Sequence, residues 1–180
     1  MRQTVLVVAA ALLHSSMALA QGQNAPTVVK SLKVPGMEVR YLDFKWDPAV
    51  WEGLEKGTGS NPVTKRSWAI ARIVLYERAL KLGTSTLPTG TNALLVLNPN
   101  LDGKGMTLEI RRVDMRDDVF HKINVVAEPP KGETLYKAPA SFEAAPSSTD
   151  RMTLTLSEVE GKVRLGVHYG DRAQTLEFTS

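Results

Sequence analysis

The sequence predicts an all-β domain, an antiparallel β-sandwich that carries one short helix near its N-terminus. From residue 87 onward, short segments alternate apolar and polar residues with the two-residue period of a half-buried strand. Pairs of turn-forming residues such as Glu160-Gly161 and Gly170-Asp171 separate these segments, as in hairpins. The strands also follow one another at the short spacing that is typical of a sandwich or a barrel.

The first strand and the helix have clear local signals. Residues 37–41 alternate apolar and polar side chains, as a strand with one buried face does. Asp47 and Pro48 are the residue types that favour a helix N-cap and first turn, and Gly57 favours a C-terminal stop. We therefore expect one helix over about Pro48–Lys56.

The stretch 67–82 fits two interpretations. Its Ala, Arg, Glu and Leu content favours a helix, and Glu77 and Lys81 could form an i,i+4 pair on its surface. Its β-branched and aromatic residues at 68–76 lack a polar helical stripe, so they also fit a strand that is buried on both faces. Local composition taken alone favours the helix.

The remaining strands follow in order and are separated by turns. Proline and glycine mark turns at 87–90 and 129–132, and a turn-rich loop spans 98–105. The Ala- and Pro-rich stretch 137–148 is expected to be irregular. We predict strands at Ala93–Leu97, Met106–Ile110, Val119–Val126, Met152–Leu156, Val163–Val167 and Thr175–Phe178.

The N-terminal residues have the layout of a secretory signal peptide. Arg2 precedes an apolar run at 5–13, and the small residues Ala18 and Ala20 define a cleavage site. The run is shorter than the ~20 apolar residues that a transmembrane helix needs. We therefore expect a periplasmic or secreted protein without a membrane anchor. Its expected parts are a signal peptide at 1–20, a flexible lead-in at 21–35 and a single domain at 36–180.

Charge and composition narrow the possible functions. Removing Arg2 with the leader lowers the formal net charge from +3 to +2, and no basic cluster remains. Nucleic acid is therefore not expected as a partner, because binding to its backbone requires concentrated Lys and Arg. The chain has no cysteine, which excludes disulfides, thiolate metal sites and c-type haem attachment. A domain of this size can be stable without such staples.

Two segments resemble a known family. Residues 80–82, the turn Leu87-Pro88-Thr89-Gly90, and Leu94 with Pro99 resemble a strand, an LPAG-type turn and a second strand. The run 152–178 resembles that family's closing meander. The chain is thus similar to the exported bacterial family known as domain of unknown function 2911 (DUF2911). The resemblance implies a β-sandwich and favours strands over 67–82; it implies no chemistry, because that family has no established activity.

One loop has the ligand spacing of an EF-hand calcium site. Such loops place oxygen ligands at positions one, three and five, glycine at six and a glutamate at twelve. The matching residues here are Asn98, Asn100, Asp102, Gly103 and Glu109. Because position one lacks a carboxylate and the flanks have strand patterns, we favour a hairpin loop that does not bind calcium tightly.

Aromatic residues gather around the predicted helix. Tyr41 and Trp46 precede it and Trp51 lies within it, so the three could form a binding surface that stacks on sugar rings. Buried aromatic side chains, however, contribute strongly to the core energy of a domain. We favour a core role for these residues and keep ligand binding as the alternative.

The sequence predicts no catalytic residue and no cofactor. Only His121 and His168 follow the leader, and no Gly-x-Ser-x-Gly elbow or phosphate loop occurs. We expect an exported, non-catalytic binding or structural module of the bacterial envelope, whose ligand or protein partner the sequence does not identify. The alternative is a periplasmic hydrolase that acts on envelope material. It would require a histidine, a carboxylate and a Ser or Thr hydroxyl in one cleft.

Overall fold

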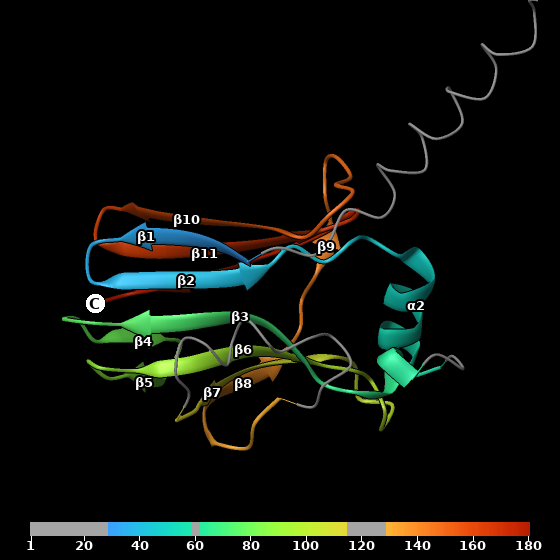
Figure 1. Cartoon of the computed structure of the whole chain (residues 1–180), viewed down its shortest axis with the longest axis horizontal. Helices are drawn as coiled ribbons and strands as arrows, with labels where there is room; N and C mark the ends of the chain where they lie inside the picture. Colours follow the sequence, from blue (N-terminus) through green and yellow to red (C-terminus); the bar gives the residue numbers. More distant parts are fainter. Residues whose placement is uncertain (1–28, 59–61, 115–128) are drawn as a thin grey trace, which may run out of the picture.

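The computed structural model describes residues 29–58, 62–114 and 129–180 (Figure 1). The expected signal peptide, residues 21–28 of the lead-in and the strand expected at 119–126 lie outside these residues. Within them the chain forms antiparallel strands and one short α-helix, which confirms the predicted fold class. No helix in this part of the chain has the length and apolar character to span a membrane.

A six-stranded sheet forms one layer of the sandwich (Figure 1). Its strand order is β1-β2-β3-β6-β7-β8, and each neighbouring pair is antiparallel. The strands are β1 (Val29–Val34), β2 (Met37–Leu42), β3 (Trp68–Leu75), β6 (Asn92–Asn98), β7 (Thr107–Arg112) and β8 (Glu133–Pro139).

The second layer consists of a four-stranded sheet and a two-stranded sheet. The first has the order β10-β11-β12-β9, and the second pairs β4 with β5. Backbone hydrogen bonds of 2.7 and 2.9 Å between Lys81 and Thr179 join β4 to the end of β12. The strands are β4 (Leu80–Leu82), β5 (Ser85–Leu87), β9 (Glu143–Ala144), β10 (Thr153–Val159), β11 (Lys162–Tyr169) and β12 (Arg172–Phe178).

The core lies between the two layers. Val39 of β2 and Ile73 of β3 are register partners, and both are fully buried, as is Leu165 on β11. The rings of Trp68 on β3 and Tyr169 on β11 lie 6.5 Å apart, so the layers meet through the sheet faces that carry these residues. The opposite face of the six-stranded sheet is therefore its outer face.

Helix α2 (Pro48–Lys56) covers one end of the sandwich (Figure 1) and has the predicted bounds. Asp47 Oδ1 accepts hydrogen bonds from the backbone N–H groups of Ala49 and Val50, at 2.9 and 3.3 Å. Gly57 ends the helix in the left-handed conformation with φ 65°. The helix packs through its buried residues Val50, Trp51 and Leu54. A 3₁₀ turn, η1 (Pro62–Lys65), follows it.

The stretch 67–82 is not a helix, so the expectation from local composition was wrong there. It forms β3 and β4, as the family resemblance implied. Strand β3 lies in the middle of the six-stranded sheet, and seven of its eight residues are buried. Burial on both faces removes the polar alternation that identifies a strand in a sequence.

Two further expectations need correction. Strand β1 occupies Val29–Val34, inside the range expected to be a flexible lead-in, because its backbone pairs with β2 along its full length. Strand β8 ends and β9 lies within 137–148, the range expected to be irregular. Both errors concern edge strands, which have few buried side chains and hence a weak apolar pattern. The three closing strands are confirmed.

Candidate functional site

The outer face of the six-stranded sheet carries two buried glutamates, each followed two residues later by an arginine on the same strand. On β2, Glu38 Oε1 accepts a hydrogen bond from Arg40 Nε at 2.7 Å. Ser31 and Tyr76 donate further hydrogen bonds to the same carboxylate, at 2.8 and 2.6 Å. Burial alone would raise the pKa of Glu38, but the hydrogen bonds from Arg40, Tyr76 and Ser31 outweigh it and lower the pKa to about 2.

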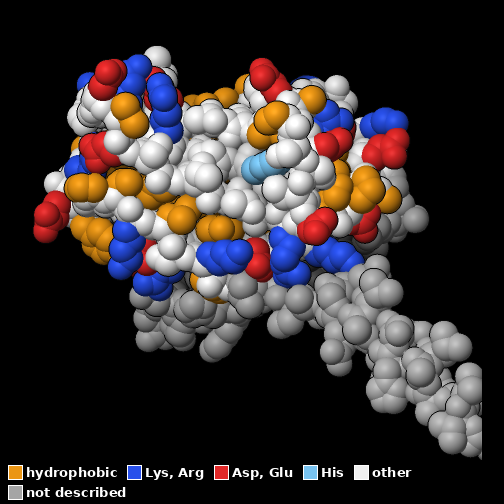
Figure 2. Space-filling view, turned by 90° about the horizontal axis from the view of Figure 1, so that it is seen from above, with side chains coloured by type: hydrophobic (Ala, Val, Ile, Leu, Met, Phe, Trp, Pro, Cys, Tyr) orange, Lys and Arg blue, Asp and Glu red, His pale blue; other side chains and the backbone are white. Residues whose placement is uncertain are grey.

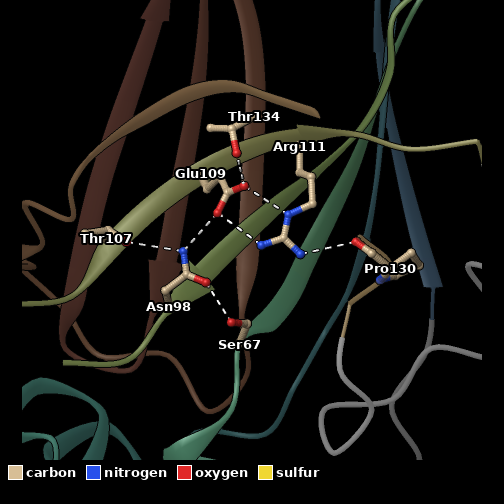
Figure 3. Close-up of polar contacts among 7 residues, drawn as sticks. All are labelled: Ser67, Asn98, Thr107, Glu109, Arg111, Pro130 and Thr134. Carbon is tan, nitrogen blue, oxygen red and sulfur yellow. Dashed lines mark hydrogen bonds and ion pairs between the residues drawn. The ribbon is translucent and has the colours of Figure 1, made fainter. Parts of the chain in front are cut away.

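The second pair, Glu109 and Arg111 on β7, is the centre of a larger hydrogen-bonded cluster (Figure 3). Arg111 Nε and Nη2 donate to the two oxygens of Glu109, at 2.9 and 3.1 Å. Thr134 Oγ1 on β8 donates to Glu109 Oε1 at 2.6 Å, and Asn98 Nδ2 on β6 donates to Oε2 at 3.4 Å. The carboxylate therefore joins three adjacent strands.

These donors keep Glu109 ionised. The hydrogen bond from Arg111 is the largest cause of a lowered pKa, burial opposes it, and Thr134 and Asn98 lower the pKa further, to about 2. Only 5% of Glu109 is exposed. A buried carboxylate with this many donors is a fixed anion and a poor proton acceptor at neutral pH.

The cluster extends in both directions across the sheet (Figure 3). Asn98 Nδ2 also donates to Thr107 Oγ1 at 3.2 Å, and Asn98 Oδ1 accepts a hydrogen bond from Ser67 Oγ at 2.7 Å. At the other side, Arg111 Nη1 donates to the carbonyl oxygen of Pro130 at 3.2 Å, and so positions the segment before β8. Most side chains in this cluster are thus held in place by at least one hydrogen bond, which makes the surface rigid.

Two open hollows lie along this rigid surface. The first has a volume of about 430 Å³, and the second of about 480 Å³. Thr107 lines the first and Glu109 the second, and these residues alternate on one face of β7, so the hollows follow each other along the strand. We call the two hollows together the β7–β8 trough. It is lined by Asn98, Pro99, Leu101, Asp102, Lys104, Gly105, Thr107, Glu109, Arg111, Pro129, Lys131, Gly132, Thr134 and Lys137.

Positive charge exceeds negative charge in the β7–β8 trough. Lys104 pairs with Asp102 at 3.3 Å, and Arg111 pairs with Glu109. The exposed residues Lys131 and Lys137 form no ion pair within the part of the chain that the structure describes. Each hollow therefore has one exposed lysine that forms no ion pair with a described acidic side chain.

Two close backbone contacts shape the trough. A Cβ atom on Gly132 would lie 1.9 Å from the carbonyl oxygen of Arg112, so only glycine lets the segment that carries Lys131 approach β7 this closely. At the other end, a Cβ on Gly57 would lie 1.7 Å from the carbonyl oxygen of Asn100. The loop between β6 and β7 thus rests directly on the C-terminal end of α2.

The residues of the calcium-like pattern do not share one ion site in this arrangement. Asn98 and Glu109 do meet, but the amide nitrogen of Asn98 faces the carboxylate. Asn100 Oδ1 accepts from the Gly105 N–H at 2.7 Å, and Asp102 Oδ1 accepts from the Lys104 N–H at 3.2 Å. The described residues contain no group of three or more His, Cys, Asp or Glu side chains that could hold a metal ion.

The predicted aromatic residues belong to the core or its border. Tyr41 and Trp51 are each only 3% exposed, so neither presents a ring face to solvent. Trp46 is half-buried between Trp51 and Tyr169, with ring centroids 6.0 and 4.8 Å away. Tyr169 donates a hydrogen bond to the Lys45 carbonyl oxygen at 2.7 Å, and burial raises its pKa. Tyr41 and Trp51 thus belong to the core, and Trp46 packs against it.

His168 has surroundings that differ from those the hydrolase alternative requires. It lies half-buried on the outer face of the four-stranded sheet. Figure 2, in which histidine is pale blue, shows a histidine side chain at the surface of the molecule. The Nε2 atom of His168 lies 2.9 Å from the carbonyl oxygen of Ser147, and no described carboxylate contacts it. His121 lies outside the described residues.

Sequence reasoning missed most of the trough. Asn98, Asp102 and Glu109 were singled out, but as residues of the calcium-like pattern, and no binding role was predicted for Lys131, Lys137 or Thr134. The alternation of Thr107, Glu109 and Arg111 places them on one strand face and could have indicated a polar row. No local pattern shows that β8 lies beside that row.

Comparisons with protein-family models, with curated proteins and with solved structures found no match to this chain. The similarity to DUF2911 is therefore a proposal that stands on the residue patterns alone. The chemistry of the trough has to be argued from its own side chains.

Proposed function

We propose that this chain is an exported, non-catalytic binding module that holds an anionic ligand in the β7–β8 trough. The observation that carries the proposal is the pair Lys131 and Lys137, one in each hollow, without an ion-pair partner among the described residues. An unpaired ammonium group can exchange water for a ligand oxygen without first breaking a salt bridge. The ligand would therefore carry carboxylate or phosphate groups.

The rigidity of the trough supports binding. Hydrogen bonds to Glu109 hold Asn98, Arg111 and Thr134 in one arrangement before any ligand arrives. Such preorganisation lowers the conformational entropy that binding costs. Glu109 itself is too strongly hydrogen-bonded to serve as a general base, which favours binding over hydrolysis.

Titration calorimetry with tripolyphosphate at low ionic strength tests this function. We expect binding that weakens with added salt, because exposed charges are screened within about 10 Å at 0.1 M. The double variant Lys131→Gln/Lys137→Gln should weaken it about tenfold, since each exposed charge pair contributes a factor of about two to five. Lys65→Gln/Lys81→Gln, which removes the same number of charges at exposed sites on η1 and β4, is the control and should bind normally. Equal affinities of all three proteins would contradict the proposal.

Export is the second part of this proposal. It is supported by the signal-peptide layout of residues 1–20. Mass spectrometry of the protein from an extracytoplasmic fraction should give a chain that begins at Gln21. Uncleaved protein confined to the cytoplasm would contradict this part and leave the binding test unaffected.

A further inference from the structure

Two hydroxyl groups that line the β7–β8 trough, those of Thr107 and Thr134, can each form a further hydrogen bond to a ligand, one as an acceptor and the other as a donor. Thr134 Oγ1 must donate to Glu109, because an ionised carboxylate can only accept. Its lone pairs are therefore what it can offer to a ligand. Thr107 Oγ1 must accept from Asn98 Nδ2, which is a donor, so its proton is left for a ligand. One group can accept and the other can donate.

The orientation of Asn98 follows from its neighbours. The atom that faces Glu109 at 3.4 Å has to be a donor, so the amide nitrogen points to the carboxylate and to Thr107. The amide oxygen then accepts from Ser67 at 2.7 Å. Because the charge of Glu109 fixes this chain of hydrogen bonds, it also fixes which capacity each threonine retains.

A neutral hydroxyl group matches this pair of capacities, because it donates one hydrogen bond and accepts others. A phosphate chain does not match these capacities. Its ionised oxygens only accept hydrogen bonds, and they would face the lone pairs of Thr134. Leu101, which is 58% exposed at the first hollow, adds an apolar contact of the kind that a sugar ring can cover.

The two lysines set the length of the ligand. Lys131 and Lys137 are six residues apart on and just before β8. At about 3.3 Å per residue their Cα atoms are separated by up to roughly 20 Å. An anion with a single charged group can contact one of them, whereas a chain with repeated charges can contact both.

We propose that the ligand of the β7–β8 trough is a linear acidic polysaccharide, in which carboxylates contact Lys131 and Lys137 and hydroxyls contact Thr107 and Thr134. This proposal rests on the proposed function, because it names the class of anion that the same trough binds. It extends that function from charge alone to a combination of charge, hydroxyl recognition and chain length.

Calorimetry with α-1,4-linked galacturonate oligomers of increasing length tests the proposal. We expect weak binding of the monomer and a rise in affinity until one chain spans both lysines, followed by a plateau, because linked contacts act at a high effective concentration. Neutral maltohexaose should bind much more weakly than the acidic hexamer. Lys131→Gln/Lys137→Gln should lower affinity for the acidic hexamer about tenfold.

The Thr134→Val variant separates hydroxyl recognition from charge. It should weaken binding of the galacturonate hexamer about three- to tenfold more than it weakens binding of tripolyphosphate, and Thr134→Ser should restore binding of the hexamer. Thermal melts of each variant show whether it is folded under the assay conditions. If tripolyphosphate binds through the lysines but the hexamer does not, or if affinity does not depend on oligomer length, this inference is wrong and the proposed function stands. If neither ligand depends on the lysines, both are wrong.

Discussion

Asn100 donates a hydrogen bond from its side-chain amide to the carbonyl oxygen of Glu55, at 2.9 Å. Its backbone N–H donates to the Leu54 carbonyl oxygen at 3.0 Å, and its Oδ1 accepts from the Gly105 N–H at 2.7 Å. One residue thus satisfies two carbonyls at the C-terminal end of α2 and closes the loop that forms one end of the trough.

The cap formed by Asn100 leads to a stability prediction. Asn100→Ala removes two side-chain hydrogen bonds and leaves the Glu55 carbonyl without its partner, so the free energy of unfolding should fall by about 1–3 kcal/mol. Urea unfolding measures this change. Asp102→Ala in the same loop is the control and should change stability little, because its ion pair with Lys104 is exposed. A loss of the same size in both variants would contradict the assignment.

The two buried glutamates predict how stability depends on pH. Glu38 and Glu109 have pKa values of about 2 in the folded chain, against an ordinary value of 4.5. A lowered pKa means that folding favours the ionised form, so this stabilisation is complete above about pH 4.5 and is lost as the pH falls toward 2. Wild-type protein should therefore lose more stability between pH 6 and pH 3 than Glu38→Gln/Glu109→Gln does.

The control for the pH experiment is Glu143→Gln, a change at an exposed carboxylate on β9. It should keep the full pH dependence of the wild type. At pH 6 the double glutamine variant should also be less stable than wild type, because the arginines beside the two glutamates lose their charge partners. If the double variant and the control had the same pH profile, the two carboxylates would not be held as described.

Gly132 gives a prediction about the shape of the trough. In Gly132→Ala the new Cβ would overlap the carbonyl oxygen of Arg112, a backbone atom that cannot rotate away. We expect a loss of about 1–3 kcal/mol in unfolding free energy and weaker tripolyphosphate binding, because the segment with Lys131 must move. Gly166→Ala is the matched change, since it meets only the Thr155 hydroxyl, which can turn aside, and it should leave binding intact.

The extent to which the sequence predicts this fold depends on where each signal lies. The ends of α2 follow from adjacent residues, Asp47-Pro48 and Gly57, so its bounds could be predicted. Strand β3 could not be separated from a helix, because burial on both faces removes the alternation. Strand β1 could not be found, because it is an edge strand whose side chains are only partly buried and so form a weak apolar pattern.

The candidate site was harder to predict, because its residues come from several strands that are brought together by strand pairing. Glu109 and Arg111 are close in sequence, and their alternation is visible. Thr134 reaches them only through the pairing of β7 with β8, which includes a register shift between Ile110 and Arg111. A bulge of this kind has no sequence signal strong enough to place Thr134 beside Glu109.

Chemical-shift mapping of a tripolyphosphate titration on ¹⁵N-labelled protein tests the central claim most directly, because it reports where the anion binds as well as whether it binds. We predict that the largest shifts fall on the amides of Thr107, Lys131, Thr134 and Lys137, and that Lys131→Gln/Lys137→Gln greatly reduces them. Shifts concentrated on β10, β11 and β12, or shifts that persist in the double variant, would contradict the assignment of the β7–β8 trough as the binding site.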